Sequence, residues 1–166
     1  LQAEAGSAAR TALRGPGKAR PGLTTMADLP ELEQLLASLF RYVQVLKELA
    51  QSPRTEFLSS GDKVGNAKYH FVVAIECCID ISNHIVASEG FRIPRSNADT
   101  FAVLAEQGIL PAERLATYQA MARFRNRLVH MYWEVDDEAV HAYLQTNLGD
   151  LDAFSEAIAR LLAKPD

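Results

Sequence analysis

The sequence predicts an all-α fold, a bundle of four long helices and one short one. Apolar side chains recur at steps of three and four residues through most of the chain, which is typical of amphipathic helices. No segment alternates apolar and polar residues as a half-buried strand does. With 166 residues, 48% of them hydrophobic, the chain is long enough for one domain with an apolar core and too short for two comfortable ones.

The first 25 residues are predicted to be a disordered N-terminal extension or leader. They are rich in Ala, Gly, Arg and Pro and contain little that a core could bury. They lack the continuous apolar run of a signal peptide, and no later segment is expected to approach the length of a membrane span. Met26 precedes the first periodic segment, so residues 26–166 are predicted to form the folded domain, without membrane attachment.

The predicted domain is acidic once the N-terminal segment is set aside. Residues 1–25 hold four basic side chains and one acidic side chain, a net charge of +3. The whole chain carries −4, so the remainder carries −7. Proteins that bind nucleic acid over a broad surface neutralise many phosphates with basic residues. That class is therefore excluded, and any contact with nucleic acid must be local.

Cys77 and Cys78 are adjacent in a segment predicted to be helical. Neighbouring side chains on a helix diverge, so the pair fits neither an ordinary disulfide nor the spacing of zinc ligands. We therefore expect no metal site and no cofactor, and the reducing cytoplasm is the compartment that fits best.

The first long helix is predicted over about residues 30–51, and Pro53 with the SSG of 59–61 ends it. Its apolar face comprises Leu29, Leu32, Leu35, Leu36, Leu39, Phe40, Val43 and Leu46. A second helix is predicted over about 62–88. It is apolar around most of its circumference, which places it at the centre of the bundle.

A narrow stripe of mostly polar residues crosses this second helix at steps of three and four: Glu76, Asp80, Asn83, His84 and Ala87. Two interpretations are open. The stripe forms a second polar wall of a cleft or a dimer contact, or it simply faces solvent.

The short helix is predicted from Asn97 to Gln107, and Gly108 ends it. Pro111 opens the next long helix, which contains FRNRLVHMYW at residues 124–133. Asp136 or Asp137 caps the last helix. Its inner face comprises Tyr143, Leu144, Leu151, Phe154, Ile158 and Leu161.

On a helical wheel the segment around FRNRLVHMYW separates into three sides. The core-facing side holds Met121, Phe124, Leu128 and Met131, and one flank holds Arg123, Asn126, Arg127 and His130. Arg125 lies on the other flank, near Val129 and Tyr132. An unbroken helix separates Arg125 from His130 by about 140° of rotation.

Arginine and histidine side chains suit metal-free RNA cleavage. The reaction needs a base for the ribose 2′-hydroxyl, an acid for the leaving 5′ oxygen, and positive charge against the phosphorane. Histidine can supply the first two because its ordinary pKa lies near neutrality. Arginine supplies the third, since its planar donors pair with phosphate oxygens. The alternative is a structural histidine at the end of a helix with solvated arginines.

Residues Arg125 to Tyr132, RNRLVHMY, match the signature of the HEPN ribonucleases, in which a polar residue directly follows the Arg of an Arg-x4-6-His motif. The His-x-Tyr ending resembles the HepT-like toxin branch, and the likeness covers most of residues 29–162. Residues 74–110 resemble the middle of that branch. The resemblance implies a HEPN-type helical bundle that is homodimeric, with the motif helices of the two subunits facing each other across a cleft.

The resemblance also implies roles for individual residues. Arg125 would bind and stabilise the scissile phosphate, His130 would act as acid, base or both, and Asn126 would orient the phosphate or the histidine. In such a dimer, Arg125 of one chain would work beside His130 of the other. Arg123 and Arg127 either help to hold RNA phosphates or are surface residues. Glu76 and Asp80 are the stripe residues assigned to the cleft.

Tyr132 resembles the tyrosine that a partner nucleotidyltransferase antitoxin, of the MntA type, modifies with AMP. The added bulk and negative charge would exclude RNA from the site. The alternative is a tyrosine at a helix end that packs by its ring and leaves its hydroxyl in water.

The predicted function is therefore the toxin of a type VII toxin–antitoxin system, a metal-independent endoribonuclease that cuts RNA, with tRNA among the candidates. The alternative is a non-catalytic helical partner that docks on a nucleotidyltransferase and presents or regulates its substrate. Both involve a homodimer and the same antitoxin partner.

Overall fold

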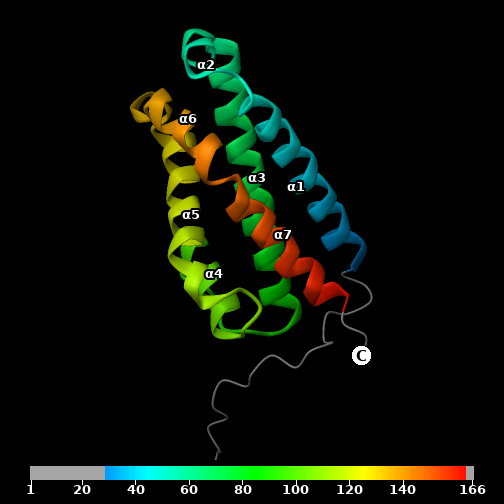
Figure 1. Cartoon of the computed structure of the whole chain (residues 1–166). Coiled ribbons are helices and arrows are strands. Elements are labelled where there is room, and N and C mark those ends of the chain that lie inside the picture. The colour runs from blue at the N-terminus through cyan, green and yellow to red at the C-terminus, as the bar shows by residue number, and fades with distance from the viewer. Residues whose placement is uncertain (1–28, 164–166) are drawn as a thin grey trace, which may run out of the picture.

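Seven α-helices and two short 3-10 helices make up residues 29–163, the part of the chain that the computed structural model describes (Figure 1). The helices are α1 (Leu29–Leu49), α2 (Arg54–Ser59), α3 (Gly61–Ser88), α4 (Asn97–Glu106), α5 (Leu115–His130), α6 (Asp137–Thr146) and α7 (Leu148–Leu162), and the 3-10 helices are η1 (Ala112–Arg114) and η2 (Tyr132–Glu134). Within these residues there is no strand, which confirms the all-α prediction. The predicted N-terminal extension, residues 1–25, lies outside the described residues.

Helix α3 is the centre of the bundle, as its composition predicts, and it contacts each of the other α-helices. Thirteen of its 28 residues are buried.

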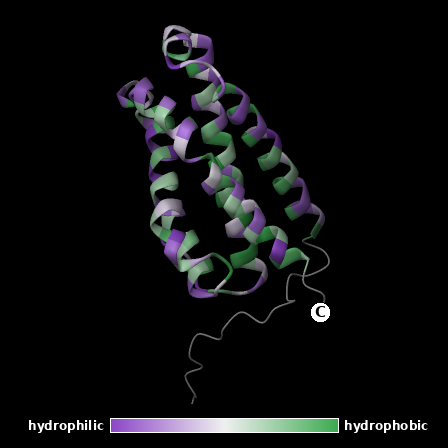
Figure 2. Cartoon of the chain, viewed as in Figure 1, coloured by the Kyte–Doolittle hydropathy of each residue, from purple (hydrophilic) through white to green (hydrophobic). Residues whose placement is uncertain are grey.

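Contrary to the sequence-based expectation, α3 is long and apolar enough to cross a membrane by length and composition alone. In the structure, 56% of that apolar window is buried within the bundle, so the packing of the core accounts for its composition. In Figure 2, by comparison, α1 and α7 carry hydrophilic and hydrophobic residues on different faces.

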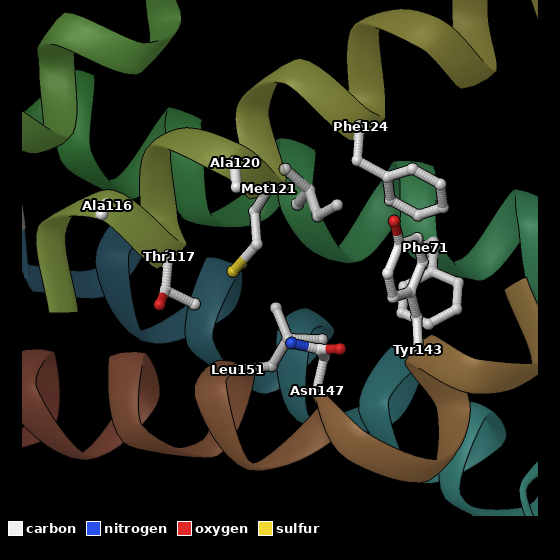
Figure 3. A pocket seen from close by; sticks show the side chains of 10 residues that line it. Phe71, Ala116, Thr117, Ala120, Met121, Phe124, Tyr143, Asn147 and Leu151 are labelled. Carbon is white, nitrogen blue, oxygen red and sulfur yellow. The ribbon is translucent and has the colours of Figure 1, made fainter. Parts of the chain in front are cut away.

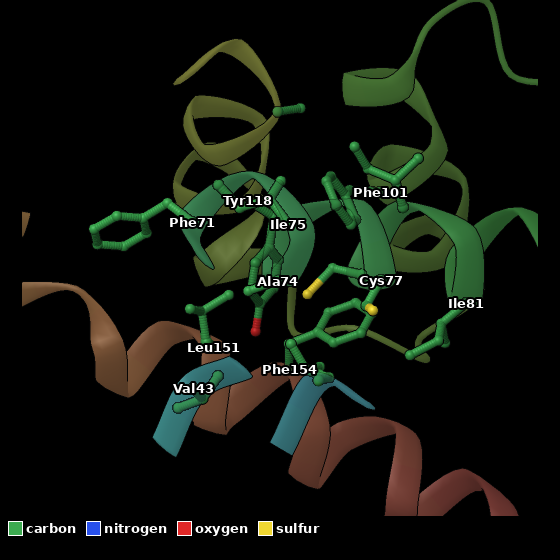
Figure 4. Close-up of a cluster of buried hydrophobic side chains, with 14 of the residues drawn as sticks. Val43, Phe71, Ala74, Ile75, Cys77, Ile81, Phe101, Tyr118, Leu151 and Phe154 are labelled. Carbon is green, nitrogen blue, oxygen red and sulfur yellow. The ribbon is translucent and has the colours of Figure 1, made fainter. Parts of the chain in front are cut away.

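Three aromatic rings pack together beside α3 in the core (Figure 4). Phe101, Tyr118 and Phe154 are fully buried, and their ring centroids lie 5.8 to 6.1 Å apart.

Cys77 and Cys78 are buried and free, in agreement with the prediction that they form no disulfide. Burial raises the pKa of the Cys77 thiol to about 11, so this group is protonated at neutral pH.

Polar side chains mark where several helices begin. The Ser60 hydroxyl accepts from the backbone N–H of Lys63 at the start of α3, and the Ser96 hydroxyl accepts from that of Asp99 at the start of α4. Asp136 caps α6, which confirms one of the two predicted caps. Gly108 follows α4 with a φ of +72°, a conformation that favours glycine and explains why the helix ends there.

Two segments differ from the prediction. Residues 53–61, expected only to end the first helix, contain α2, because Phe57 is fully buried there and holds the segment against α3 and α6. The single last helix is two helices, broken at Asn147. The Asn147 amide donates to Asp150 and its oxygen accepts from the Thr146 hydroxyl, and such local side-chain bonds compete with helical backbone bonds.

The motif helix ends earlier than the helical wheel assumes. Helix α5 ends at His130, and Met131 adopts φ −136° and ψ 46° before η2 begins. Met131 is therefore exposed rather than core-facing. Leu128 is buried as predicted, and Phe124 is half-buried against Phe71 and Tyr143.

The two glycines with contrasting backbones give a test of the fold. Gly65 lies inside α3, and a methyl group there would meet the Tyr132 hydroxyl only at 4.0 Å. We expect Gly65→Ala to raise the free energy of unfolding by about 0.5–1 kcal/mol, because alanine loses less backbone entropy in a helix. Gly108→Ala, at positive φ, should lower it by about 1 kcal/mol. Urea denaturation of both variants measures the free energy of unfolding. A change in the same direction for both would contradict the helical conformation assigned to Gly65 or the positive φ assigned to Gly108.

Candidate active site

One flank of α5 carries basic side chains that have no partner within the described residues. Arg123, Arg127 and His130 are exposed and succeed one another at helical steps of four and three. No hydrogen bond or ion pair between described residues engages any of these three side chains, so their donors are free. Asn126 lies on the same flank, as the helical wheel predicts.

Arg125 points to the other side of α5 and is held there. Its Nε donates to Oε2 of Glu76 on α3 at 2.6 Å, and its Nη1 donates to Oδ1 of Asn126 at 3.2 Å. The Arg125 side chain is only 20% exposed. The structure therefore brings together Glu76, Arg125 and Asn126, three of the predicted site residues, and fixes the guanidinium against α3.

Asp80 lies one turn beyond Glu76 on the exposed stripe of α3. Partial burial and the neighbouring Glu76 carboxylate raise the pKa of Asp80 above its ordinary value, while Arg125 lowers it. Glu76 thus bonds to Arg125, and Asp80 lies close enough to interact electrostatically with both.

The other polar residues of the predicted stripe face different helices. Oδ1 of Asn83 accepts from the Thr100 hydroxyl on α4 at 3.0 Å, and Nδ1 of His84 lies 3.7 Å from Oε2 of Glu31 on α1. The stripe is therefore not uniform. Its Glu76 and Asp80 portion lies beside the motif helix, whereas Asn83 and His84 serve the packing of α4 and α1.

Tyr132 and Arg125 both lie against α3, although not next to each other. The Tyr132 ring packs under the ammonium group of Lys68, with Nζ 4.4 Å from the ring centroid, whereas Arg125 meets Glu76. Lys68 and Glu76 are eight residues apart, about 12 Å along the helix. Helices α3 and α5 are therefore antiparallel, and Tyr132 marks one end of the motif.

His130 and Arg125 of one chain point in different directions. Arg125 faces α3, whereas His130 lies on the exposed flank five residues later. The observed helix preserves the separation of about 140° and adds about 7.5 Å along its axis. One copy of the chain therefore does not bring the guanidinium and the imidazole together.

Lys68 is a residue of this region that the sequence interpretation missed. It is the only charged residue buried within the described chain, at 5% exposure. Its Nζ lies 2.9 Å from Oδ1 of Asp137 and donates to the Val135 carbonyl at 3.4 Å. A lysine within the apolar face of the central helix was the available signal, because burying an ammonium group requires specific partners.

A pocket of about 350 Å³ lies elsewhere, between α5 and the α6–α7 pair above α3 (Figure 3). Its wall is formed mainly by apolar side chains, among them Phe71, Met121, Phe124 and Leu151. None of the predicted site residues lines it. The candidate chemistry therefore belongs to an exposed surface of α5 and α3, and this pocket is separate from it.

Comparison with known proteins gives this arrangement a context. The family model described as ribonuclease HepT-like matches residues 39–158. The mRNA nuclease HepT of Shewanella oneidensis is 34% identical over 83 residues, which are 50% of this chain and 62% of that protein. The matched part thus spans less than two thirds of this relative.

Solved structures with the same fold include toxin–antitoxin complexes. A toxin–antitoxin structure with AMP-PNP aligns with a TM-score of 0.73 at 23% identity, covering 78% of this chain and 97% of that one. A tri-AMPylated Shewanella oneidensis HEPN toxin in complex with MNT antitoxin aligns with a TM-score of 0.72 at 24% identity, covering 78% and 96%. YutE, a cytosolic protein of unknown function from Bacillus subtilis, aligns with a TM-score of 0.71 at 18% identity, covering 81% and 90%.

The fold of these structures is the fold of this chain, and the family model spans the helices from α1 to α7, including the Arg125–His130 motif. The chain belongs to the ribonuclease HepT-like family.

Proposed function

We propose that this chain is the toxin of a type VII toxin–antitoxin pair, a metal-independent endoribonuclease that cuts RNA through Arg125 and His130. One observation carries the proposal. Arg125 is anchored on α3, while Arg123, Arg127 and His130 are exposed on the adjoining flank and have no partner among residues 29–163, in a chain whose net charge is −4. Such a local concentration of free donors suits a phosphodiester.

Each group has a defined role in the proposed reaction. Nη2 of Arg125, which has no hydrogen-bond partner among the described residues, donates to a phosphate oxygen as negative charge builds on the phosphorane. His130 takes the proton of the 2′-hydroxyl, the 2′ oxygen bonds to phosphorus, and the bond to the 5′ oxygen breaks. His130, now protonated, gives a proton to that 5′ oxygen, and a 2′,3′-cyclic phosphate remains. Asn126, bonded to Arg125, orients the guanidinium.

We propose that a homodimer brings the guanidinium and the imidazole together. Because Arg125 and His130 of one copy diverge, the site is completed when Arg125 of one copy meets His130 of the other. Exposed apolar side chains favour self-association: Val129 and Trp133 flank His130, and Tyr69 is exposed on the antiparallel α3. The substrate is then RNA that can enter a shared cleft, such as a single-stranded segment or an exposed end of mRNA or tRNA.

The regulatory partner is proposed to be a nucleotidyltransferase antitoxin that adds AMP to Tyr132. Structural relatives include an AMPylated HEPN toxin in complex with MNT antitoxin. Tyr132 is 47% exposed at the end of the motif helix, where a partner can reach it. An added AMP group would bring bulk and negative charge to the edge of the surface that must receive RNA.

RNA cleavage by the isolated chain tests the enzymatic proposal. We expect the antitoxin-free protein, with a chelator present, to leave 2′,3′-cyclic phosphate ends. His130→Ala and Arg125→Ala should each lower the cleavage rate by about 100-fold or more, through loss of proton transfer and of phosphorane stabilisation. His70→Gln, which changes a histidine of α3 bonded to the Asn66 carbonyl, is the matched control.

Mixing the two inactive variants tests whether the site is shared. Random pairing of His130→Ala and Arg125→Ala subunits should restore about a quarter of the wild-type rate, because half of the dimers then contain one complete site of two. A site within one chain predicts no restoration. Wild-type protein that cleaves no RNA and leaves growth unaffected would favour the non-catalytic partner subunit.

The two acidic neighbours of Arg125 are expected to act in opposite directions. Glu76→Gln weakens the bond that fixes the guanidinium, so we expect a lower maximal cleavage rate, by about tenfold. Asp80→Asn removes a charge that repels phosphate without removing that bond, so KM for RNA should fall. We therefore expect kcat/KM to fall in Glu76→Gln and to rise in Asp80→Asn. Steady-state kinetics on the two variants measures both changes, and kcat/KM changes of the same sign would refute the assigned geometry.

Intact-mass analysis tests the modification of Tyr132. After co-expression with the nucleotidyltransferase antitoxin, wild-type protein should gain the mass of one or more AMP groups. We expect Tyr132→Phe to lose this gain, because it removes the acceptor oxygen, whereas Tyr69→Phe, at an exposed tyrosine of α3, should keep it. An unmodified wild type would remove the regulatory proposal and leave the nuclease proposal intact.

A further inference from the structure

Lys68 connects α3 to the segment that follows the motif helix. Its ammonium group meets three partners within residues 132–137: the face of the Tyr132 ring, the Val135 carbonyl and the Asp137 carboxylate. The Lys68 side chain is 6% exposed, whereas that of Asp137 is 49% exposed. The cation is thus enclosed beneath η2, and its counter-charge lies at the surface.

Packing alone does not explain a cation in this place. Removing an ammonium group from water is costly, and an apolar side chain of similar volume often stabilises a buried site equally well. Besides the bonds to Val135 and Asp137, which serve only to satisfy the ammonium group itself, an apolar residue would lose the directed contact with the Tyr132 ring. A cation over an aromatic face holds the ring by its electrostatic quadrupole, and the contact is stronger where water is excluded.

The hydroxyl end of the Tyr132 ring lies next to a glycine. Its hydroxyl lies over Gly65 of α3, at 4.0 Å from the position that a β-carbon of residue 65 would occupy. Because Gly65 has no side chain, nothing from this position of α3 covers the hydroxyl. The ring is therefore held at its face, Gly65 places no side chain against its hydroxyl, and Tyr132 as a whole is 47% exposed.

We propose that Lys68 is a positioning residue for Tyr132 as the acceptor of the nucleotidyl group. This inference rests on the proposed modification of Tyr132. In that step, the phenolic oxygen bonds to the α-phosphorus of an ATP held by the antitoxin, the bond from that phosphorus to the bridging oxygen breaks, pyrophosphate leaves, and the phenolic proton passes to solvent. A ring already held in place loses less rotational freedom on reaching this arrangement, so transfer is faster.

The test measures the rate of AMP addition to purified chains by the purified antitoxin and ATP, using intact mass against time. Lys68→Met keeps the buried length and removes the charge, and Lys68→Arg keeps the charge. We expect Lys68→Met to lower the rate at saturating antitoxin by about tenfold, with unchanged affinity for the antitoxin. Lys68→Arg should recover most of the rate, which a purely structural role in filling space would not predict. Thermal unfolding and circular dichroism establish that each variant is folded.

Asp137→Asn separates the ring contact from the ion pair, because it removes the Asp137 charge and leaves the cation over Tyr132. Its rate should stay closer to wild type than that of Lys68→Met. AMP addition to folded Lys68→Met at the wild-type rate would overturn the inference. An equal loss of rate in Asp137→Asn, or a loss of rate that follows from weaker antitoxin binding, would overturn it as well. An unmodified wild type would instead refute the proposed function on which this inference depends.

Discussion

The arrangement of this protein depends on the burial of α3. A helix that contacts every other α-helix has only one stripe of its surface left for solvent, so its polar residues are confined to that stripe or must find partners inside. Glu76 and Asp80 occupy the stripe and meet α5 there, whereas Lys68 is inside and is neutralised by Asp137. The hydrophobic packing of α3 thus determines which of its positions can place a charged side chain beside the motif.

The antiparallel contact between α3 and α5 sets the geometry of the motif. It anchors Arg125 through Glu76 near the middle of α3 and Tyr132 through Lys68 nearer its beginning. Between them, the opposite flank of α5 presents His130 to solvent. In this arrangement the proposed phosphate ligand, Arg125, is bonded to Glu76 and Asn126, the proposed proton carrier, His130, is exposed, and the proposed modification site, Tyr132, is held separately by Lys68.

The acidic character of the chain matters for a proposed RNA site. A surface with net negative charge repels a polyanion except where basic residues are concentrated, and the exposed Arg123 and Arg127 of α5 form such a place. Modification of a residue at the edge of that place would change the local charge balance at little structural cost. The separate apolar pocket between α5 and α6–α7 has no comparable charge among its lining residues.

The sequence by itself determined the helical periodicities, the central place of α3, the acidic balance and the motif, because these follow from residue spacing and composition. Only the tertiary structure decided the break at Asn147, the helix around Phe57 and the end of α5 at His130, since these depend on local bonds and on burial by distant residues. The pairing of Arg125 with Glu76 and of Lys68 with Tyr132 joins residues 49 and 64 positions apart, and periodicity carries no information on which helix faces meet.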